Sequence, residues 1–185
     1  ILKRSKGINV PHVSLGGALV TNDDEIANKL RKLKDFGRTG GGNDIHDTIG
    51  FNFKFTELQA CIGIEQMKKL KKRVEIKKLL FKKYYERLDG ITGIKLFDHN
   101  LDLTAPWFID CIAESRDNLM MFLKEHNIGS RVMYPPLNKQ KAYDEEGEHV
   151  VSNSIGTNGL WLPSYAQLTD SEITHVTSTI RDFYK

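Results

Sequence analysis

The stretch HDTIGFNFKFTELQACIGIEQMKKL, residues 46–70, joins a loop rich in glycine and aromatic residues to the start of a long helix. The first part mixes turn-forming residues with isolated phenylalanines, which is unlike a flexible linker and indicates an ordered, functional loop. Thr56 and Gln59 have the spacing of a capping box, in which each side chain accepts a hydrogen bond from the other residue's backbone N–H. Apolar residues then recur at a helical period as far as Asp89-Gly90, which predicts a long helix, either continuous or interrupted near its middle.

The residues before this stretch predict a strand and a helix. GGALVT, residues 16–21, is a short apolar run that predicts a strand. Asn22 and Glu25 then offer a capping pattern for a helix over residues 25–36. Ile26, Leu30 and Leu33 form one apolar stripe on this helix, which ends at Gly37.

The residues after Gly93 predict a mixture of short strands and helices. IKLF, APWFIDCIA, GSRVMY and residues 160–162 have the pattern of strands, and residues 115–126 that of a helix. Thr169 and Glu172 form a second capping box, which begins a final helix. We therefore expect residues 1–90 to form one domain part that includes the long helix, and residues 91–185 to form a small α+β domain.

The composition excludes some classes of function. The 185 residues are 39% hydrophobic, which is enough for a buried core, and 27 basic against 24 acidic residues give a net charge of only +3. This charge is far below that of a typical nucleic-acid-binding domain, so no nucleic-acid partner is expected. No apolar run approaches the roughly 18 residues that cross a bilayer. We expect no membrane partner and a cytoplasmic location.

The cysteine and histidine residues do not have the spacing of a metal site. Cys61 and Cys111 lie in apolar surroundings without a CxxC motif, which favours two buried free thiols over a disulfide. The histidines show no HExxH or comparable ligand spacing. No metal ligands are therefore predicted.

Four stretches together resemble one protein family: GGALVTNDDEIANKLRKLKDFGR, the HDTIGFNFKF stretch above with the helix that follows it, SRVMYPPLN and GLWLPSYAQLTDSEI. In order and spacing they are similar to the DegT/DnrJ/EryC1/StrS sugar aminotransferases, and most to the perosamine-synthase type. The resemblance implies an α/β fold: part of a type I, aspartate-aminotransferase-like PLP-transferase large domain, followed by a small α+β domain. It covers the carboxy-terminal half of such a protein.

The resemblance also implies an activity. Family members use pyridoxal 5'-phosphate to transfer an amino group from an amino acid, expected here to be glutamate, to the keto group of a nucleotide-linked deoxysugar. The reaction belongs to sugar and polysaccharide biosynthesis. The implied ligands are a nucleotide sugar and an amino-acid donor, and the implied assembly is a homodimer.

The family's Schiff-base lysine has no clear counterpart in this chain. Counting back from Gly16 places Asn9 at its position, while an alternative alignment of NVPH places His12 there. One explanation is that residues 1–15 are altered sequence in an otherwise ordinary aminotransferase. A second is that His12 acts as a base, as in related sugar 3-dehydratases. The third is a catalytically silent fragment or pseudoenzyme. Lys6 lies three residues too early for the motif.

Two residues match cofactor-binding positions of the family. Asn52, in the Gly-Phe-Asn block, matches an asparagine that reaches across the dimer to the cofactor phosphate; its alternative role is that of a turn-forming residue. Lys54 matches a basic position that contacts cofactor or nucleotide phosphates, or is a plain surface lysine. The glycines at 40–42 are interpreted as a mobile loop or a phosphate contact, and His46 and Asp47 as residues that order the loop.

Two further residues match positions near the substrate. Arg131 and Tyr134 lie in SRVMYPPLN, where an arginine would pair with the diphosphate of the sugar nucleotide or, in the alternative, remain a solvated side chain. Asn138 stands where many family members have histidine.

Overall fold

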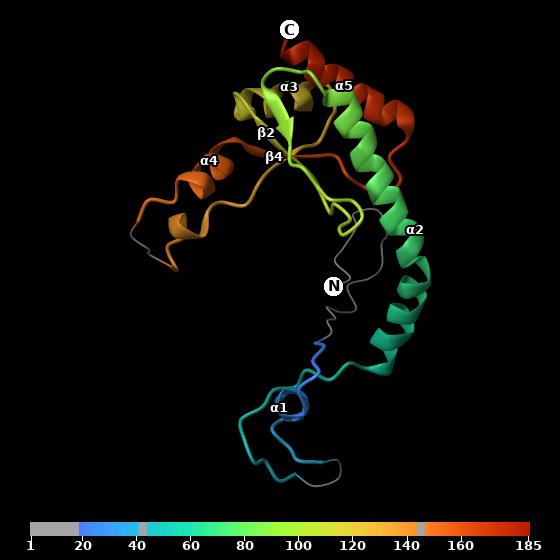
Figure 1. The fold of residues 1–185 in the computed structure, drawn as a ribbon, viewed down its shortest axis with the longest axis vertical. Helices are drawn as coiled ribbons and strands as arrows, with labels where there is room; N and C mark the ends of the chain where they lie inside the picture. Colours follow the sequence, from blue (N-terminus) through green and yellow to red (C-terminus); the bar gives the residue numbers. More distant parts are fainter. Residues whose placement is uncertain (1–18, 41–43, 144–146) are drawn as a thin grey trace. The chain divides into compact units, whose positions relative to one another are not determined.

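The computed structural model describes residues 19–40, 44–143 and 147–185 (Figure 1). The chain divides into two compact units, residues 1–69 and 70–185, which are described separately below. This division falls inside the helix over residues 57–88. The boundary that we expect near residue 90 separates the two domains of the aminotransferase-like fold, and it stays a prediction. Within the described residues, no helix combines the length and the apolar character that crossing a membrane requires.

The first unit contains α1, Asp24–Lys34. Its N-cap is Asp23, whose carboxylate accepts hydrogen bonds from the backbone N–H groups of Glu25 and Ile26, so the prediction of Asn22 was wrong by one residue. The expected strand over residues 16–21 is also wrong for its described part, residues 19–21. A strand requires a neighbouring strand to bond with its backbone, and no described segment pairs with these residues.

The end of α1 is bonded to the Gly-Phe-Asn block. Phe51 donates its backbone N–H to the carbonyl of Leu33 (2.7 Å), and Phe53 donates to that of Lys34 (3.0 Å). These carbonyls lie in the last turn of the helix and have no partner within it. The loop therefore satisfies the helix end, which confirms the expectation of an ordered segment.

The long helix α2 spans Glu57–Leu88 without interruption. Its predicted capping box is present: Thr56 donates its N–H to Gln59 Oε1 (2.7 Å), and Gln59 donates its N–H to Thr56 Oγ1 (3.3 Å). Cys61, near its start, is exposed, so the expectation of a buried thiol was wrong there. All the buried side chains of α2 lie in its last three turns, because only that end packs on the core of the second unit.

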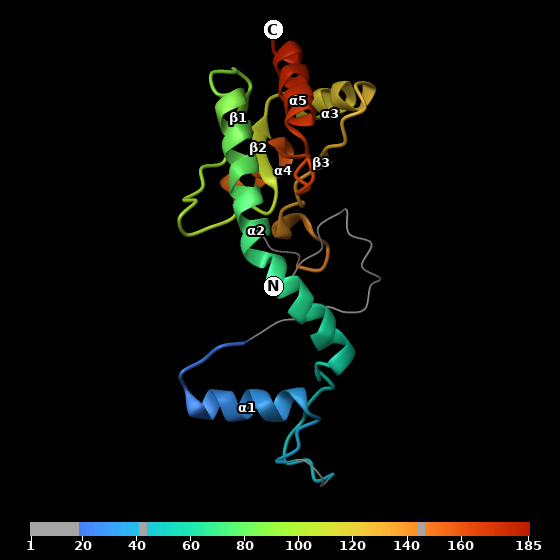
Figure 2. The ribbon, with the colours of Figure 1, turned by 90° about the vertical axis from the view of Figure 1, so that its right-hand side faces the viewer.

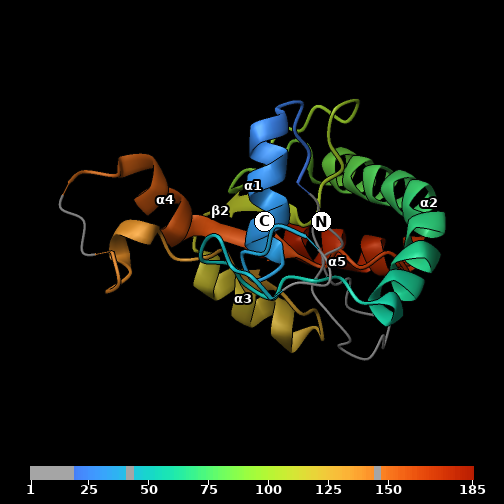
Figure 3. The ribbon, with the colours of Figure 1, turned by 90° about the horizontal axis from the view of Figure 1, so that it is seen from below.

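The second unit is built on a four-stranded antiparallel sheet in the order β1-β2-β4-β3. The strands are β1 (Ile94–Leu96), β2 (Ile109–Ala113), β3 (Arg131–Val132) and β4 (Gly159–Leu162). All four were predicted from the sequence. The helices are α3 (Arg116–Glu125), α4 (Val150–Asn158) and α5 (Asp170–Phe183), with the 3-10 helix η1 at Leu137–Lys139. Figure 3 shows η1 and α4 extending away from the sheet; neither was predicted.

One face of this sheet carries the core. Residues 109, 111 and 113 of β2 and residues 160 and 162 of β4 point to this face. The last turns of α2 cover it together with α3 and α5, which contact each other (Figure 2). The largest fully buried side chains include Tyr84, Leu119, Leu123 and Ile180. Cys111 is buried as expected, and burial raises the pKa of its thiol.

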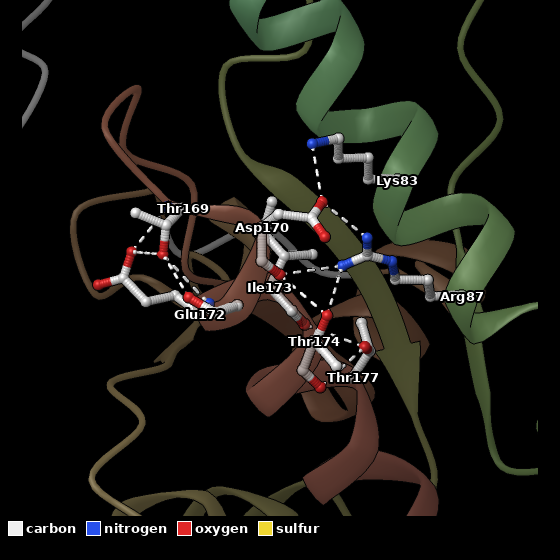
Figure 4. Close-up of polar contacts among 9 residues, drawn as sticks. Lys83, Arg87, Thr169, Asp170, Glu172, Ile173, Thr174 and Thr177 are labelled. Atoms are coloured by element: carbon white, nitrogen blue, oxygen red, sulfur yellow. Dashed lines mark hydrogen bonds and ion pairs between the residues drawn. The ribbon is translucent and has the colours of Figure 1, made fainter.

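The first turn of α5 has two polar networks (Figure 4). In the first, the carboxylate of Asp170 accepts hydrogen bonds from Lys83 Nζ (2.8 Å) and Arg87 Nη2 (2.7 Å), which joins α5 to α2. In the second, Glu172 Oε2 accepts the backbone N–H of Thr169 (2.7 Å), and Thr169 Oγ1 accepts the N–H of Glu172 (3.3 Å). The predicted capping box is thus confirmed.

We predict that Thr169→Ala lowers the free energy of unfolding by about 1 kcal/mol, because it removes the N-cap oxygen while the buried face of α5 stays intact. Thr169→Ser retains an oxygen at the same position and is the matched control. Urea denaturation followed by circular dichroism measures both. An equal loss in both variants would mean that the threonine methyl group, and not the cap, is responsible.

Candidate functional site

The predicted site residues lie in two separate groups. Asn52 and Lys54 belong to the first unit, and Arg131 and Tyr134 to the second. His12 lies outside the described residues, as do Gly41 and Gly42. Each group is therefore described within its own unit.

Asn52 is held by its backbone. It forms an antiparallel bridge with Asp35, beyond the end of α1, and its neighbours Phe51 and Phe53 both bond to that helix. Side chains alternate along an extended segment, and the rings of Phe51 and Phe53 stack with centroids 5.2 Å apart. Asn52 is exposed, and no hydrogen bond joins its carboxamide to any described residue. The backbone of Asn52 is thus held in position, and its side chain is exposed.

Lys54, two residues further along, is neutralised within the unit. Its Nζ lies 2.8 Å from Asp35 Oδ1, the same oxygen that accepts a hydrogen bond from Arg38 Nη2 at 2.6 Å. Both cations also lie over the ring of Phe36, at 5.1 Å for Lys54 and 5.5 Å for Arg38. The hydrogen bond from Lys54, followed by that from Arg38, lowers the pKa of Asp35 below its ordinary value of 3.8.

Further contacts order the rest of this loop. His46 Nδ1 lies 2.7 Å from the carbonyl oxygen of Phe36, and Lys32 Nζ donates to Asp47 Oδ2 at 3.2 Å. Gly37 has a φ of +79°, and a Cβ there would lie 1.7 Å from the carbonyl oxygen of Thr48. Only glycine fits this position. The contacts of His46 and Asp47 agree with the predicted loop-ordering role.

Arg131 in the second unit lies on aromatic rings. Its Cζ lies 5.4 Å from the centroid of the Tyr134 ring and 5.6 Å from that of the Trp161 ring. The two rings meet edge to face, with centroids 4.8 Å apart. Arg131 is exposed, and within the described part of the chain no acceptor is hydrogen-bonded to its guanidinium. The predicted pair, Arg131 and Tyr134, is therefore brought together, with Trp161 as an additional member.

Sequence reasoning missed three residues of these groups. No motif in the sequence indicated a role for Asp35, which lies two residues before Gly37. Trp161 was predicted only to lie in a strand. Lys77 of α2 was not singled out, yet its Nζ donates to the carbonyl oxygens of Trp107 (2.8 Å) and Ser164. Burial lowers the pKa of Lys77 to about 8. These roles depend on contacts between distant segments.

The fold is that of a class of protein: part of a type I, aspartate-aminotransferase-like large domain, followed by a small α+β domain. The sequence profile of the DegT/DnrJ/EryC1/StrS aminotransferase family matches residues 12–181. The chain belongs to this family.

Relatives with known names are similar along most of the chain. GDP-perosamine synthase of Vibrio cholerae is 28% identical over 177 residues, covering 91% of this chain and 48% of its own length. The dTDP-4-amino-4,6-dideoxy-D-glucose transaminase of Shigella dysenteriae is 30% identical, covering 90% and 48%. This chain thus spans about half the length of these curated relatives.

Solved structures agree with the fold. A DegT DnrJ EryC1 StrS aminotransferase from Brucella abortus superposes with a TM-score of 0.81 at 27% identity, covering 89% of this chain and 45% of its own. DesV of S. venezuelae, solved in complex with a ketimine intermediate, superposes with a TM-score of 0.78 at 26% identity, covering 90% and 46%. The prediction of the family and of the fold class is confirmed.

We predict that Asp35→Asn speeds hydrogen exchange at the backbone N–H groups of Phe51 and Phe53, because Lys54 and Arg38 are then left without their shared counter-charge. Since contact with these cations lowers the pKa of Asp35 in the folded chain, its stabilising effect is complete above pH 3.8 and is lost as the pH falls through the lower folded value. This acid-dependent loss of protection should be absent from the variant.

The matched control is Asp47→Asn, which removes a carboxylate with one cationic contact in the same loop. Mass spectrometry of the exchanging amides measures both variants. Equal protection in Asp35→Asn and the unmodified protein would show that backbone bonding alone holds the segment.

Proposed function

We propose that the protein containing this chain transfers an amino group from an amino acid, with glutamate as donor, to the keto group of a nucleotide-linked deoxysugar. Membership in the family supports this proposal, as do relatives named for perosamine synthesis and for a dTDP-linked aminosugar. The observation that supports it most is a pair of exposed side chains, the amide of Asn52 and the guanidinium of Arg131, to neither of which a described residue is hydrogen-bonded. We place the reaction in cytoplasmic sugar or polysaccharide biosynthesis.

The proposed cofactor is pyridoxal 5'-phosphate, which supplies an electron sink for amino transfer when bound. Asn52 fits its phosphate group, because an amide N–H is a suitable donor to a phosphate oxygen and this amide has no described competitor. In the proposed homodimer, Asn52 would reach the cofactor of the neighbouring subunit.

Lys54 fits the phosphate less directly. Its charge is compensated by Asp35, so binding a phosphate would require it to leave or share that carboxylate. We propose that Lys54 contributes to the cofactor site chiefly by keeping the Asn52 segment in place. The group that moves protons in the reaction stays unassigned, because Asn9 and His12 both lie outside the described residues.

Arg131 is proposed to bind the diphosphate of the sugar nucleotide. A guanidinium presents several N–H donors in one plane and suits phosphate oxygens. Tyr134, more than half of whose surface is exposed, offers a ring and a hydroxyl beside it. The amino donor carries no diphosphate, so this contact distinguishes the two substrates.

We predict that Asn52→Ala in the intact protein weakens binding of pyridoxal phosphate, because one phosphate donor is lost, while dimers still form. Asn28→Ala is the matched control, since Asn28 is another exposed asparagine of the first unit, on α1. Titration followed by cofactor absorbance measures affinity, and light scattering measures assembly. Unchanged affinity with lowered stability would support the turn-forming role of Asn52 instead.

We predict that Arg131→Ala raises the Michaelis constant for the sugar nucleotide far more than that for the amino donor. A charge-assisted hydrogen bond contributes roughly 1.5 to 3 kcal/mol, which corresponds to about tenfold to a hundredfold. Steady-state kinetics with glutamate and a nucleotide-linked keto-sugar measures both constants.

The two ways in which this experiment can fail have different meanings. Equal increases for both substrates would place Arg131 in support of the fold or the cofactor. Absence of amino transfer by the unmodified protein would contradict the proposed activity itself.

A further inference from the structure

A row of three side chains crosses the sheet of the second unit on the face opposite the core. Asp110 of β2 pairs with Trp161 of β4, and Trp161 pairs with Arg131 of β3. Directly paired residues point to the same face of a sheet. Trp161 therefore stands between an acidic and a basic residue.

This position keeps the two charges apart. Neighbouring strands lie about 4.8 Å apart, so the backbones of Asp110 and Arg131 are separated by roughly 10 Å. The carboxylate of Asp110 lies between the side chains of Trp161 and His99, and His99 Nε2 is 3.6 Å from it. The intervening indole thus leaves Arg131 without an acidic partner on this row.

The indole is itself held in an aromatic stack. The rings of Phe108 and Trp161 lie nearly parallel, with an interplanar angle of 15° and centroids 4.2 Å apart. Trp161 is only 6% exposed, whereas Arg131 lies over its ring and is exposed. A guanidinium on a fixed ring loses less conformational freedom when it binds an anion than one on a free side chain.

Lys77 fastens both segments that supply the stack. It donates to the carbonyl oxygen of Trp107, the residue before Phe108, and to that of Ser164, shortly after Trp161. The ammonium group of Lys77 thereby connects α2 both to the segment before β2, which supplies Phe108, and to the segment that follows β4, the strand that supplies Trp161. The rings that support Arg131 are fixed by backbone contacts as well as by packing.

We propose that Trp161 is a positioning residue for Arg131, which it orients toward phosphate oxygens and shields from Asp110. This inference rests on the proposed anion-binding role of Arg131 and adds a residue that acts only through it. Trp161 itself is too deeply buried to contact a ligand.

A double-mutant cycle tests this, with calorimetric titration of inorganic pyrophosphate into the intact protein. Trp161→Leu should weaken pyrophosphate binding on the order of threefold to tenfold, since the support for the guanidinium is lost. Trp161→Phe retains a ring and should stay within about twofold. In the background of Arg131→Ala, Trp161→Leu should have no further effect.

An additive effect of Trp161→Leu in that background would overturn the proposal, as would the absence of pyrophosphate binding by the unmodified protein. Should Trp161→Leu fail to fold, Phe108→Leu replaces it in the same cycle, because it removes the other half of the stack. The titration requires no turnover, so its result stands apart from that of the amino-transfer assay.

Discussion

The antiparallel pairing of β2 with β4 is the constraint on which the second unit depends. Its register places Cys111 opposite Leu160 and Asp110 opposite Trp161. Side chains alternate between the faces of a strand, so a slip by one residue would expose the first pair and bury the charge of Asp110. The same register therefore determines the core under α2, α3 and α5 and the row that supports Arg131.

A different constraint acts in the first unit, where no sheet is formed by the described residues. The backbone N–H groups of Phe51 and Phe53 complete the open end of α1, and Asp35 adds an ionic contact beside them. These bonds hold the loop segment against the end of α1. The backbone N–H groups on both sides of Asn52 are thus bonded to the end of α1, while its side chain stays exposed.

The sequence predicted the elements that are determined locally. Both capping boxes depend on side chains a few residues apart, and the structure confirms them, as it does the four strands predicted from short apolar runs; α1 ends at Lys34, before the predicted end at Gly37. The strand over residues 19–21 failed because strand formation requires a distant partner. Prediction of the site was limited in the same way. Arg131 and Tyr134 are close in sequence and were predicted together. The contacts of Trp161 and Lys77 join segments that are far apart, and they were missed.

The two proposed phosphate contacts also differ in their electrostatics. In the first unit Asp35 and Asp44 compensate the charges of Arg38 and Lys54, so the proposed contact beside them is made by the uncharged amide of Asn52. In the second unit Trp161 separates Arg131 from Asp110, so a full positive charge remains. An amide contact depends on position and responds little to ionic strength, whereas an exposed charge is screened by salt. Raised salt should accordingly weaken a ligand held by Arg131 more than one held by Asn52, because only the first contact relies on net charge.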